Sequence, residues 1–413
     1  MKEIWIVQTG EPMPSDSGQR PMRAINLSES LFKNGFKVKI ITSKFFHQKK
    51  IHRKSDKKFF SNSIEEVYID SPGYKKNLSF SRLFDHAIIA INLKKYLKSI
   101  SKKPDLIFVG FPPIEFAYVA TKWAHKNKIP CIIDIKDQWP NLFYENRPIL
   151  VKLIMKLIFV PYDMMAKSSI IKSSSITGPT ESYIHWALKK SNIIRRNKDR
   201  PFALVSDKAK ASNKMKKSNQ IIKGYNELKQ SFNILFVGSH MSVFDFKHIA
   251  KAASRLQTYK DIKFIICGDG DYLESNKFFF RGLDNTLFPG WVNIDEYREL
   301  ADISSCAIAP YKDISNYRDN IPNKITDYLS FGLPIIWSLS GEVKNLINNY
   351  QCGLIYQHGS GKDLSKKILM LKNSPNHMIE YSENAINLHK SLFNKENIYN
   401  DLVIHIKDII SGK

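Results

Sequence analysis

Several features that define other classes of protein are missing from this chain of 413 residues. It has no run of about 18 apolar residues, so we expect no membrane-spanning helix. The segment Met1–Val7 enters a strand pattern at once, without the apolar region of a signal peptide. The few cysteines stand alone, which predicts buried free thiols in a reducing compartment such as the cytoplasm. They are Cys131, Cys267, Cys306 and Cys352.

Motifs for metal and cofactor binding are also missing. There is no H-E-x-x-H sequence and no Cys/His cluster, so we expect no zinc site. No G-x-G-x-x-G sequence is present, which argues against a dinucleotide cofactor. The segment Gly359–Lys362 imitates a P-loop, but Tyr356 stands where the first glycine is required. Asp269-Gly270-Asp271 matches a D-x-D metal motif, but a tight turn explains it, so neither metal nor cofactor is predicted.

Acidic residues are scarce, because 39 Asp and Glu face 63 Lys and Arg and give a formal net charge of +24. Such a surplus predicts an anionic partner: nucleotides, phospholipid head groups or nucleic acid. A lysine-rich, solvated surface explains part of the charge equally well. Lysine far outnumbers arginine, and no helix-turn-helix, zinc finger or aromatic and basic platform is visible. Nucleic-acid binding is therefore the weaker hypothesis.

Short apolar runs alternate with helical patterns along most of the chain. Several runs are continuously apolar, which is typical of strands buried on both faces of a parallel sheet. The alternation predicts repeated strand–helix units, and hence an α/β fold. The runs lie at residues 4–9, 38–42, 106–110 and 131–135, and then at 234–238, 264–268, 306–310 and 334–337.

A strongly basic segment interrupts this alternation and divides the chain. We expect one domain at residues 1–190, a basic linker at 191–229, and a second domain at 230–391. Two helical patterns follow the last strand run. The final one, at about 392–413, is expected to pack back onto the first domain.

Ligands bind beyond the carboxyl ends of the strands in open parallel sheets, which directs attention to the loops there. The loop Gly10–Gly18 can bring backbone N–H groups to a phosphate or a sugar hydroxyl, although a plain turn is as good an interpretation. After the run 131–135, Asp137 precedes Gln-Trp-Pro; its carboxylate either orients acceptor hydroxyls or caps a helix. Gly268 and Gly270 allow a backbone to approach a ligand.

The most informative segment is Tyr317–Pro334. A helix is predicted to begin near Pro322, and its N-terminus, Arg318 and Lys324 together suit a diphosphate. Asp327 lies about one turn further along and can accept hydrogen bonds from a vicinal diol such as a ribose. A capped surface helix with charges placed by chance is the alternative.

This segment resembles the retaining glycosyltransferases of family 4, which have the GT-B fold. Pro322–Pro334 matches their pattern P-x-K-x-x-E-Y-L-x-x-G-x-P, and Asp319 and Asp327 have the spacing of their E-x₇-E pair. Asp137-Gln138-Trp139-Pro140 is similar to the D-x-W-P of members that build bacterial surface polysaccharides. Further stretches follow in the family's order: Phe236-Val237-Gly238, Ile266–Gly270, Pro289–Val292, Ala309–Tyr311, Glu342 and Cys352–Leu354.

The resemblance implies two Rossmann-like domains with parallel sheets facing across a cleft. It implies that Lys324 binds the donor diphosphate, that Asp327 holds the ribose, and that Asp319 contacts donor sugar hydroxyls. Two carboxylates are then the catalytic candidates, Asp319 and Asp137. The donor-binding candidates are Gly18, Gly238, Gly268, Val292, Arg318, Lys324 and Asp327.

The chain also departs from the family's pattern. Both members of the acidic pair are Asp rather than Glu, so their side chains are shorter. The family often has Arg directly after the glycine of the first strand in the second domain. Here Ser239 and His240 follow Gly238, and Lys247 comes late. Arg318 or Lys247 is the expected substitute.

The implied activity is metal-independent transfer of a hexosyl or related sugar from a nucleotide diphosphate-sugar, without a cofactor. The implied acceptor is a glycan or a polyprenyl-diphosphate-linked glycan, in O-antigen or capsule biosynthesis. A nucleotide-sugar epimerase of the same fold and a basic nucleic-acid-binding protein are the alternatives.

The apolar stretch Ile149–Val160 has two interpretations. It is either a helix that rests on an anionic membrane, such as the inner face of the plasma membrane, or a core helix. In the second interpretation Lys152 and Lys156 extend outward to water, and this is the one that we favour from sequence.

Overall fold

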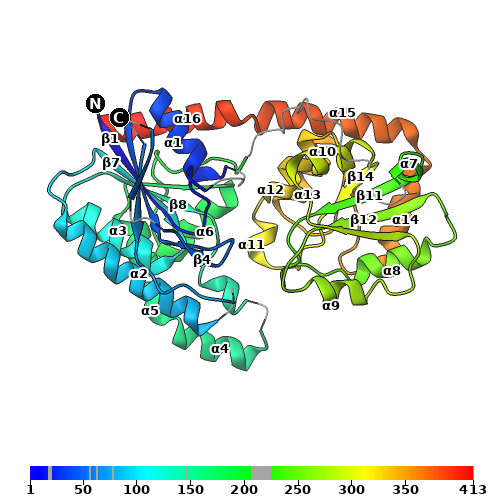
Figure 1. Cartoon of the computed structure of the whole chain (residues 1–413), viewed down its shortest axis with the longest axis horizontal. Helices are drawn as coiled ribbons and strands as arrows, with labels where there is room; N and C mark the ends of the chain where they lie inside the picture. The colour runs from blue at the N-terminus through cyan, green and yellow to red at the C-terminus, as the bar shows by residue number, and fades with distance from the viewer. Residues whose placement is uncertain are drawn as a thin grey trace. The chain divides into compact units, whose positions relative to one another are not determined.

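The structure is a computed structural model that describes residues 1–16, 21–54, 57–61, 64–76, 79–145, 147–205 and 225–412. The chain divides into two compact units (Figure 1). The first comprises Met1–Val205 and Lys395–Lys413, and the second Ser206–Asn394. Each unit is built on its own largely parallel sheet, which confirms the predicted pair of Rossmann-like α/β domains.

The first unit contains an eight-stranded sheet in the order β10-β9-β8-β7-β1-β2-β6-β5. All neighbours are parallel except β5 and β6. The strands are β1 (Glu3–Val7), β2 (Lys37–Ser43), β5 (Lys57–Ser61), β6 (Ile64–Ile69), β7 (Leu106–Phe111), β8 (Cys131–Ile135), β9 (Ser175–Gly178) and β10 (Arg200–Pro201). A separate antiparallel pair is formed by β3 (Phe45–Phe46) and β4 (Ile51–His52).

Helices connect these strands and cover the sheet. They are α1 (Arg23–Lys33), α2 (Phe80–Ser99), α3 (Ile114–Lys126), the 3₁₀ turn η1 (Asn141–Phe143), α4 (Ile149–Ile158), α5 (Val160–Lys172), α6 (Glu181–Ser191) and α16 (Lys395–Ser411). The terminal helix α16 packs against α1 in this unit, where Asn26 Nδ2 donates to Tyr399 Oη at 3.5 Å and Lys407 to Asn34 at 2.8 Å.

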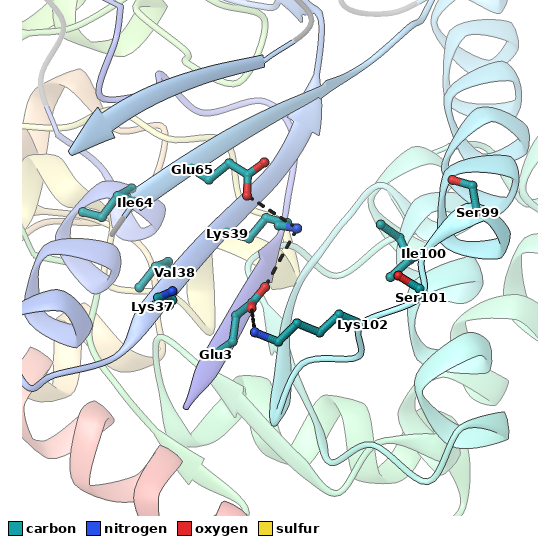
Figure 2. Close-up of a pocket in the computed structure, with 10 residues that line it drawn as sticks. All are labelled: Glu3, Lys37, Val38, Lys39, Ile64, Glu65, Ser99, Ile100, Ser101 and Lys102. Atoms are coloured by element: carbon teal, nitrogen blue, oxygen red, sulfur yellow. Dashed lines mark ion pairs between the residues drawn. The ribbon is translucent and has the colours of Figure 1, made fainter. Parts of the chain in front are cut away.

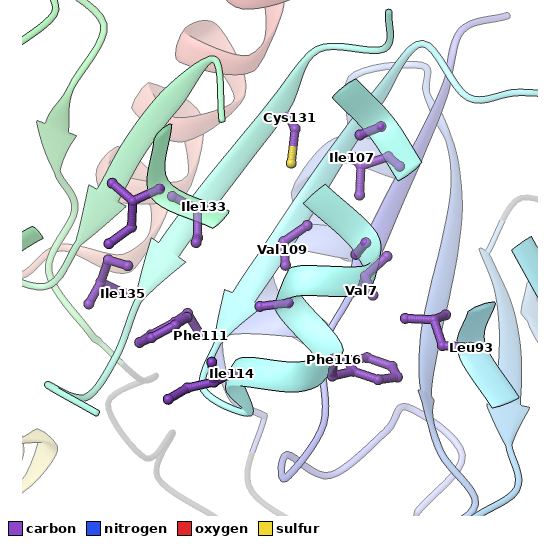
Figure 3. Packing of buried hydrophobic residues seen from close by; sticks show 14 of the residues in the cluster. Val7, Leu93, Ile107, Val109, Phe111, Ile114, Phe116, Cys131, Ile133 and Ile135 are labelled. Atoms are coloured by element: carbon purple, nitrogen blue, oxygen red, sulfur yellow. The ribbon is translucent and has the colours of Figure 1, made fainter. Parts of the chain in front are cut away.

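The core of the first unit lies between its central strands and α3 (Figure 3). Val7 on β1, Val109 on β7 and Ile133 on β8 are fully buried. Phe116 on α3 packs with them from the helix side. Each such side chain contributes about 1.5–3 kcal/mol by leaving water, so the apolar runs that predicted the strands also account for their stability.

An ion pair is buried at the carboxyl half of the same sheet. Arg23 Nε lies 3.1 Å from Asp134 Oδ2, and neither side chain is exposed to solvent. Thr177 Oγ1 donates a hydrogen bond of 2.8 Å to the other oxygen of Asp134. The ion pair joins α1 to β8, and the hydrogen bond from Thr177 adds β9. Loss of either charged partner would leave the other charge buried and uncompensated, which is strongly destabilising.

The second unit contains a six-stranded parallel sheet in the order β13-β12-β11-β14-β15-β16. Its strands are β11 (Phe232–Val237), β12 (Ile262–Cys267), β13 (Thr286–Gly290), β14 (Cys306–Ile308), β15 (Ile335–Trp337) and β16 (Gly353–Ile355). Its helices are α7 (Tyr225–Leu228), α8 (Lys247–Arg255), α9 (Leu273–Phe278), α10 (Ile294–Asp302), α11 (Ser315–Arg318), α12 (Asn323–Ser330), α13 (Glu342–Tyr350), α14 (Gly361–Lys372) and α15 (Pro375–Leu392).

The strand order creates a topological switch point in the second unit. From β11 the chain proceeds outward through β12 and β13, and then returns to continue through β14, β15 and β16 on the other side. The connections therefore leave β11 and β14 in opposite directions. In sheets of this kind ligands bind just beyond the strand ends at the switch point, which here means the loops after Val237 and Ile308.

The segment predicted as a linker begins inside the first unit. Arg200 and Pro201 form β10, which pairs with Thr177 and Gly178 of β9. Arg196 and Asp199 form an ion pair of 3.0 Å beside it. Residues 206–224 of the predicted linker lie outside the described residues.

The core-helix interpretation of residues 149–160 is wrong. Helix α4 has no buried residue along its whole length. Among the helices of the described ranges, none combines the length and the apolar character that crossing a membrane requires.

Candidate functional site

The side chain of Lys324 lies at the switch point of the second unit. It projects from the first turn of α12, and its Nζ donates a hydrogen bond of 2.9 Å to the carbonyl of Val237, the last residue of β11. The ammonium lies over the rings of Phe236 and Phe244, at 5.3 and 5.5 Å from their centroids. These contacts hold a positive charge at a helix start beside a strand end, an arrangement suited to an anion.

Two glycines allow the ends of β11 and β12 to approach each other beside this ammonium. A Cβ atom on Gly238 would lie 1.7 Å from Lys324 Nζ, so only glycine leaves room for the lysine. Gly268 follows β12 with φ of +129°, and a Cβ there would lie 2.0 Å from the carbonyl oxygen of Gly238. The predicted donor-binding residues Gly238, Gly268 and Lys324 are thus brought together in one place.

Tyr328, one turn after Lys324 on α12, spans the switch point itself. Its hydroxyl accepts from the N–H of Val237 at 3.4 Å and donates to the carbonyl of Ile308 at 3.1 Å. The two strands pair only as far as Leu235 and Ala307, so the hydroxyl joins them where their own ladder has ended. Burial raises the pKa of Tyr328, which keeps it a donor.

Replacing Tyr328 with phenylalanine removes that bridge. We expect the free energy of unfolding to fall by about 1–3 kcal/mol, because a buried N–H and a buried carbonyl lose their partner. Urea unfolding of the purified variant measures the change, and Tyr350→Phe, an exposed tyrosine on α13, is the matched control. Equal stability of Tyr328→Phe and the wild type would show that the bridge contributes nothing.

His240 is part of the same edge and was not singled out from the sequence as a site residue. The ring is fully buried, stacks on Phe246 with centroids 5.4 Å apart, and has Nδ1 3.0 Å from the Asn276 amide. Burial, followed by the nearby charge of Lys324, lowers the pKa of His240 to about 4, so the imidazole is neutral at physiological pH. The only feature of the sequence that could have indicated His240 is its position two residues after Gly238.

The remaining predicted residues of this unit lie around the same strand ends. Asp327 is nearly buried on α12, and its charge adds to burial in raising the pKa of Tyr311, just after β14. Arg318 Nε pairs with Asp313 at 2.8 Å, and Asp319 is the C-cap of α11. Val292 is buried two residues beyond Gly290, whose carbonyl accepts from the N–H of Gly268 at 2.7 Å.

Two motifs that imitate other sites have structural explanations. Asp269 Oδ1 accepts from the N–H of Gly270 at 2.7 Å, which is a turn contact. Ser360 caps α14 by accepting from the N–H of Asp363 at 3.1 Å. In the part of the chain that the structure describes, no group of three or more His, Cys, Asp or Glu side chains is placed to hold a metal ion.

In the first unit, the predicted residue Asp137 follows β8 at the carboxyl edge of the sheet, whereas Gly18 lies outside the described residues. The neighbouring Trp139 is 5% exposed, with the guanidinium of Arg82 over its ring at 4.9 Å. Phe143 packs against the same ring in a T-shaped contact, at 4.6 Å between ring centroids. Trp139 is therefore a packing residue, and it positions the turn that carries Asp137.

Beside Trp139 lies a buried acid that sequence reasoning missed. Glu115 occupies the first turn of α3, and its Oε2 is 3.9 Å from Nδ1 of His86. Burial raises the pKa of Glu115 to about 7, and burial lowers the pKa of His86 to about 3. The two groups are accordingly both neutral in mildly acidic solution.

The raised pKa of Glu115 has a consequence for stability. The folded state binds more protons than the unfolded state between the ordinary value of 4.5 and about 7, so stability falls as pH rises through this window. Glu115→Gln cannot ionise. We therefore expect its free energy of unfolding to rise by about 2 kcal/mol relative to that of the wild type when the pH is raised from 4.5 to about 7. Chemical unfolding at both ends of this pH window measures the difference between the two proteins. The exposed Glu396→Gln is the control, and an equal gain in both variants would contradict the assignment.

A pocket of about 370 Å³ lies at the opposite edge of the first sheet (Figure 2). Two of the lysines that line it are paired with acids: Lys39 Nζ lies 3.8 Å from Glu3 and 3.5 Å from Glu65, and Lys102 Nζ lies 3.4 Å from Glu3. Glu3, Lys39 and Glu65 lie in the first residues of β1, β2 and β6, and Lys102 lies in the loop that precedes β7. The pocket is thus at the edge where parallel sheets do not bind ligands.

A comparison with models of known protein families found one match, which lies in the second unit. Residues 217–388 match the family model described as Glycosyl transferases group 1. No curated protein matches the chain.

Solved structures are similar over the whole chain. Sucrose-phosphate synthase from Thermosynechococcus elongatus is 12% identical, with a TM-score of 0.71 and 100% of both chains covered. WaaG, a glycosyltransferase involved in lipopolysaccharide biosynthesis, is 14% identical, with a TM-score of 0.67 and again 100% of both chains. Anabaena HepE in complex with UDP is 12% identical, with a TM-score of 0.64 over 99% of this chain and 100% of that one. At these identities the likeness establishes the fold, which is GT-B.

Proposed function

We propose that this chain is a retaining glycosyltransferase that uses a nucleotide diphosphate-sugar as donor. The observation that carries the proposal is the position of Lys324, whose ammonium is fixed against the end of β11, over two aromatic rings and beside Gly238. The match of residues 217–388 to the group 1 glycosyl transferases supports it. So does the UDP bound by the similar HepE structure.

In the proposed reaction the bond between the anomeric carbon and the diphosphate oxygen breaks, and the diphosphate leaves with its negative charge. Lys324, Arg318 and the N-terminus of α12 stabilise that charge as it develops, because they are fixed before the reaction begins. The acceptor oxygen then bonds to the anomeric carbon on the face that the diphosphate leaves, and its proton passes to a leaving phosphate oxygen. No separate protein base and no metal ion are needed.

The remaining roles follow the resemblance found in the sequence. Asp327 holds the ribose, Asp319 contacts hydroxyls of a hexosyl or related sugar, and Gly268 and Val292 border the base. Asp137 orients the acceptor hydroxyl. The D-x-W-P sequence at Asp137 supports an acceptor in bacterial surface polysaccharide, O-antigen or capsule, carried as a glycan or on polyprenyl diphosphate at the cytoplasmic face.

Incubation with a panel of nucleotide sugars tests the proposal. With acceptor glycans present, we expect the release of nucleoside diphosphate from one donor class and a new glycosidic bond with the donor's anomeric configuration, both detected by NMR. The same reaction in the presence of a chelator tests metal independence. Formation of an epimer from donor alone would instead identify an epimerase, and salt-sensitive retention of DNA without any turnover would favour a nucleic-acid-binding protein.

A further inference from the structure

Helix α4 of the first unit exposes an apolar surface that nothing in that unit covers. Leu150 and Leu157 are 72% and 74% exposed, and the other large side chains of the helix are similarly open to solvent. They are Ile149, Val151, Leu153, Ile154 and Ile158, and the surface continues onto α5 through Val160 and Met164. Scattered exposed apolar side chains are ordinary, but a continuous group of this size marks a binding surface.

Aromatic contacts of Phe159 hold this helix to the rest of the unit. Phe159, which lies between α4 and α5, is 7% exposed and stacks on Phe143 with ring centroids 5.2 Å apart. The ring of Tyr162 also approaches Phe159, at 5.4 Å between centroids. The turn is thereby anchored at the C-terminal end of α4, while the helix itself extends away from the sheet beyond α5 (Figure 1).

The charges on and just before α4 are all of one sign. Arg147, Lys152 and Lys156 lie on or just before α4, Lys167 lies on α5, and no Asp or Glu occurs between residues 147 and 162. The next acid, Asp163, forms an ion pair with Lys190. An apolar surface bordered by basic side chains is the composition of helices that lie in the interface of anionic membranes.

We propose that α4 and the start of α5 form a docking surface for an anionic phospholipid bilayer. The helix lies in the plane of the interface, its leucines and isoleucines enter the acyl region, and its lysines contact lipid phosphates. A second copy of the chain fits less well, because a two-fold contact would bring the same lysines and arginine of both copies together without any acid between them. The surface is independent of donor binding, so its test and the test of sugar transfer can fail separately.

Sedimentation with lipid vesicles tests the docking surface. We expect the wild type to bind vesicles containing about 30% phosphatidylglycerol and to bind phosphatidylcholine vesicles much more weakly. Leu150→Ser with Leu157→Ser should reduce the binding about tenfold or more. Lys152→Gln with Lys156→Gln should reduce both the binding and its sensitivity to salt. The matched control replaces Ile194 and Ile404 with serine, two exposed isoleucines elsewhere in the unit, and should bind as the wild type does.

The depth of the helix in the bilayer can be measured with a fluorophore. The native cysteines are buried, so an added Leu157→Cys is the thiol that a polarity-sensitive label reaches first. We expect its emission to shift to the blue with anionic vesicles, whereas a label at Ile404→Cys should not shift. Unchanged emission at position 157, or equal binding by the serine double variant and its control, overturns the proposal. A dimer in vesicle-free solution that the serine double variant abolishes would overturn it in favour of a second copy.

Discussion

Lys324→Met is expected to reduce the rate of sugar transfer by about 10²–10³, the loss that follows removal of one preorganised group from a developing negative charge. The ammonium is held by the carbonyl of Val237 and by two aromatic rings, so no other cation can take its position without rearrangement. Steady-state kinetics with the donor identified by the nucleotide-sugar panel measures the change. The loss should be in kcat as well as in kcat/KM, since the charge grows as the diphosphate leaves.

Methionine is chosen because its apolar stem can still pack against Phe236 and Phe244. The thermal unfolding of the variant should therefore remain close to that of the wild type. Lys344→Met, on the exposed side of α13 in the same unit, is the matched control and should transfer sugar normally. Wild-type turnover by Lys324→Met would contradict the role given to this side chain.

Gly268→Ala is expected to destabilise the second unit strongly. The added Cβ would lie 2.0 Å from the carbonyl oxygen of Gly238, and φ is +129°. Overlap with backbone cannot be relieved by a side-chain rotation, so β11 and β12 must separate at their carboxyl ends. Strain and overpacking together suggest a loss of about 3 kcal/mol or more in the free energy of unfolding. Donor binding should be lost with it.

Gly282→Ala separates the two causes of this loss. Gly282 has φ of +76°, but a Cβ there meets nothing within 4 Å. It should cost only about 1 kcal/mol, the strain of the left-handed conformation alone. Urea unfolding of the two variants gives the comparison, and similar losses would show that close approach of the strands is not what requires glycine at position 268.

The sequence predicted the strands whose residues are apolar without interruption, such as β7, β8 and β12. It missed β9, because Ser175–Gly178 is short and polar in composition, although all four residues are buried. It also missed β6, where Glu65 and Glu66 interrupt the apolar pattern, and β13, which contains Pro289. Pairing with neighbouring strands decides such elements, and it is not visible in a local pattern.

The candidate site was predicted as a set of residues but not as a geometry. The motif around Lys324 indicated a phosphate-binding helix start, yet the contact between Lys324 and Val237 joins residues 87 positions apart in the chain. The bridge made by Tyr328 across β11 and β14 depends on the strand order, which local patterns do not give. His240 and Glu115 owe their shifted pKa values to burial, which becomes known only when the surrounding strands and helices are in place.

The helix α4 shows a different limit. A run such as Ile149–Val160 has the same composition whether it fills a core or covers a membrane surface, and the lysines at positions 152 and 156 suit both. What distinguishes the two is whether other elements pack on it. The stacking of Phe159 on Phe143 is a tertiary contact, which a local pattern does not predict. It holds only the C-terminal end of α4 and leaves the helix itself exposed.

The central claim is that Lys324 at the switch point of the second unit binds the diphosphate of the donor. Calorimetric titration with a nucleoside diphosphate and the matching monophosphate, in the wild type and in Lys324→Met, tests it directly. We predict that the wild type prefers the diphosphate by about tenfold or more, and that the variant loses most of this preference while it binds the monophosphate almost unchanged. An identical preference in both proteins would contradict the claim.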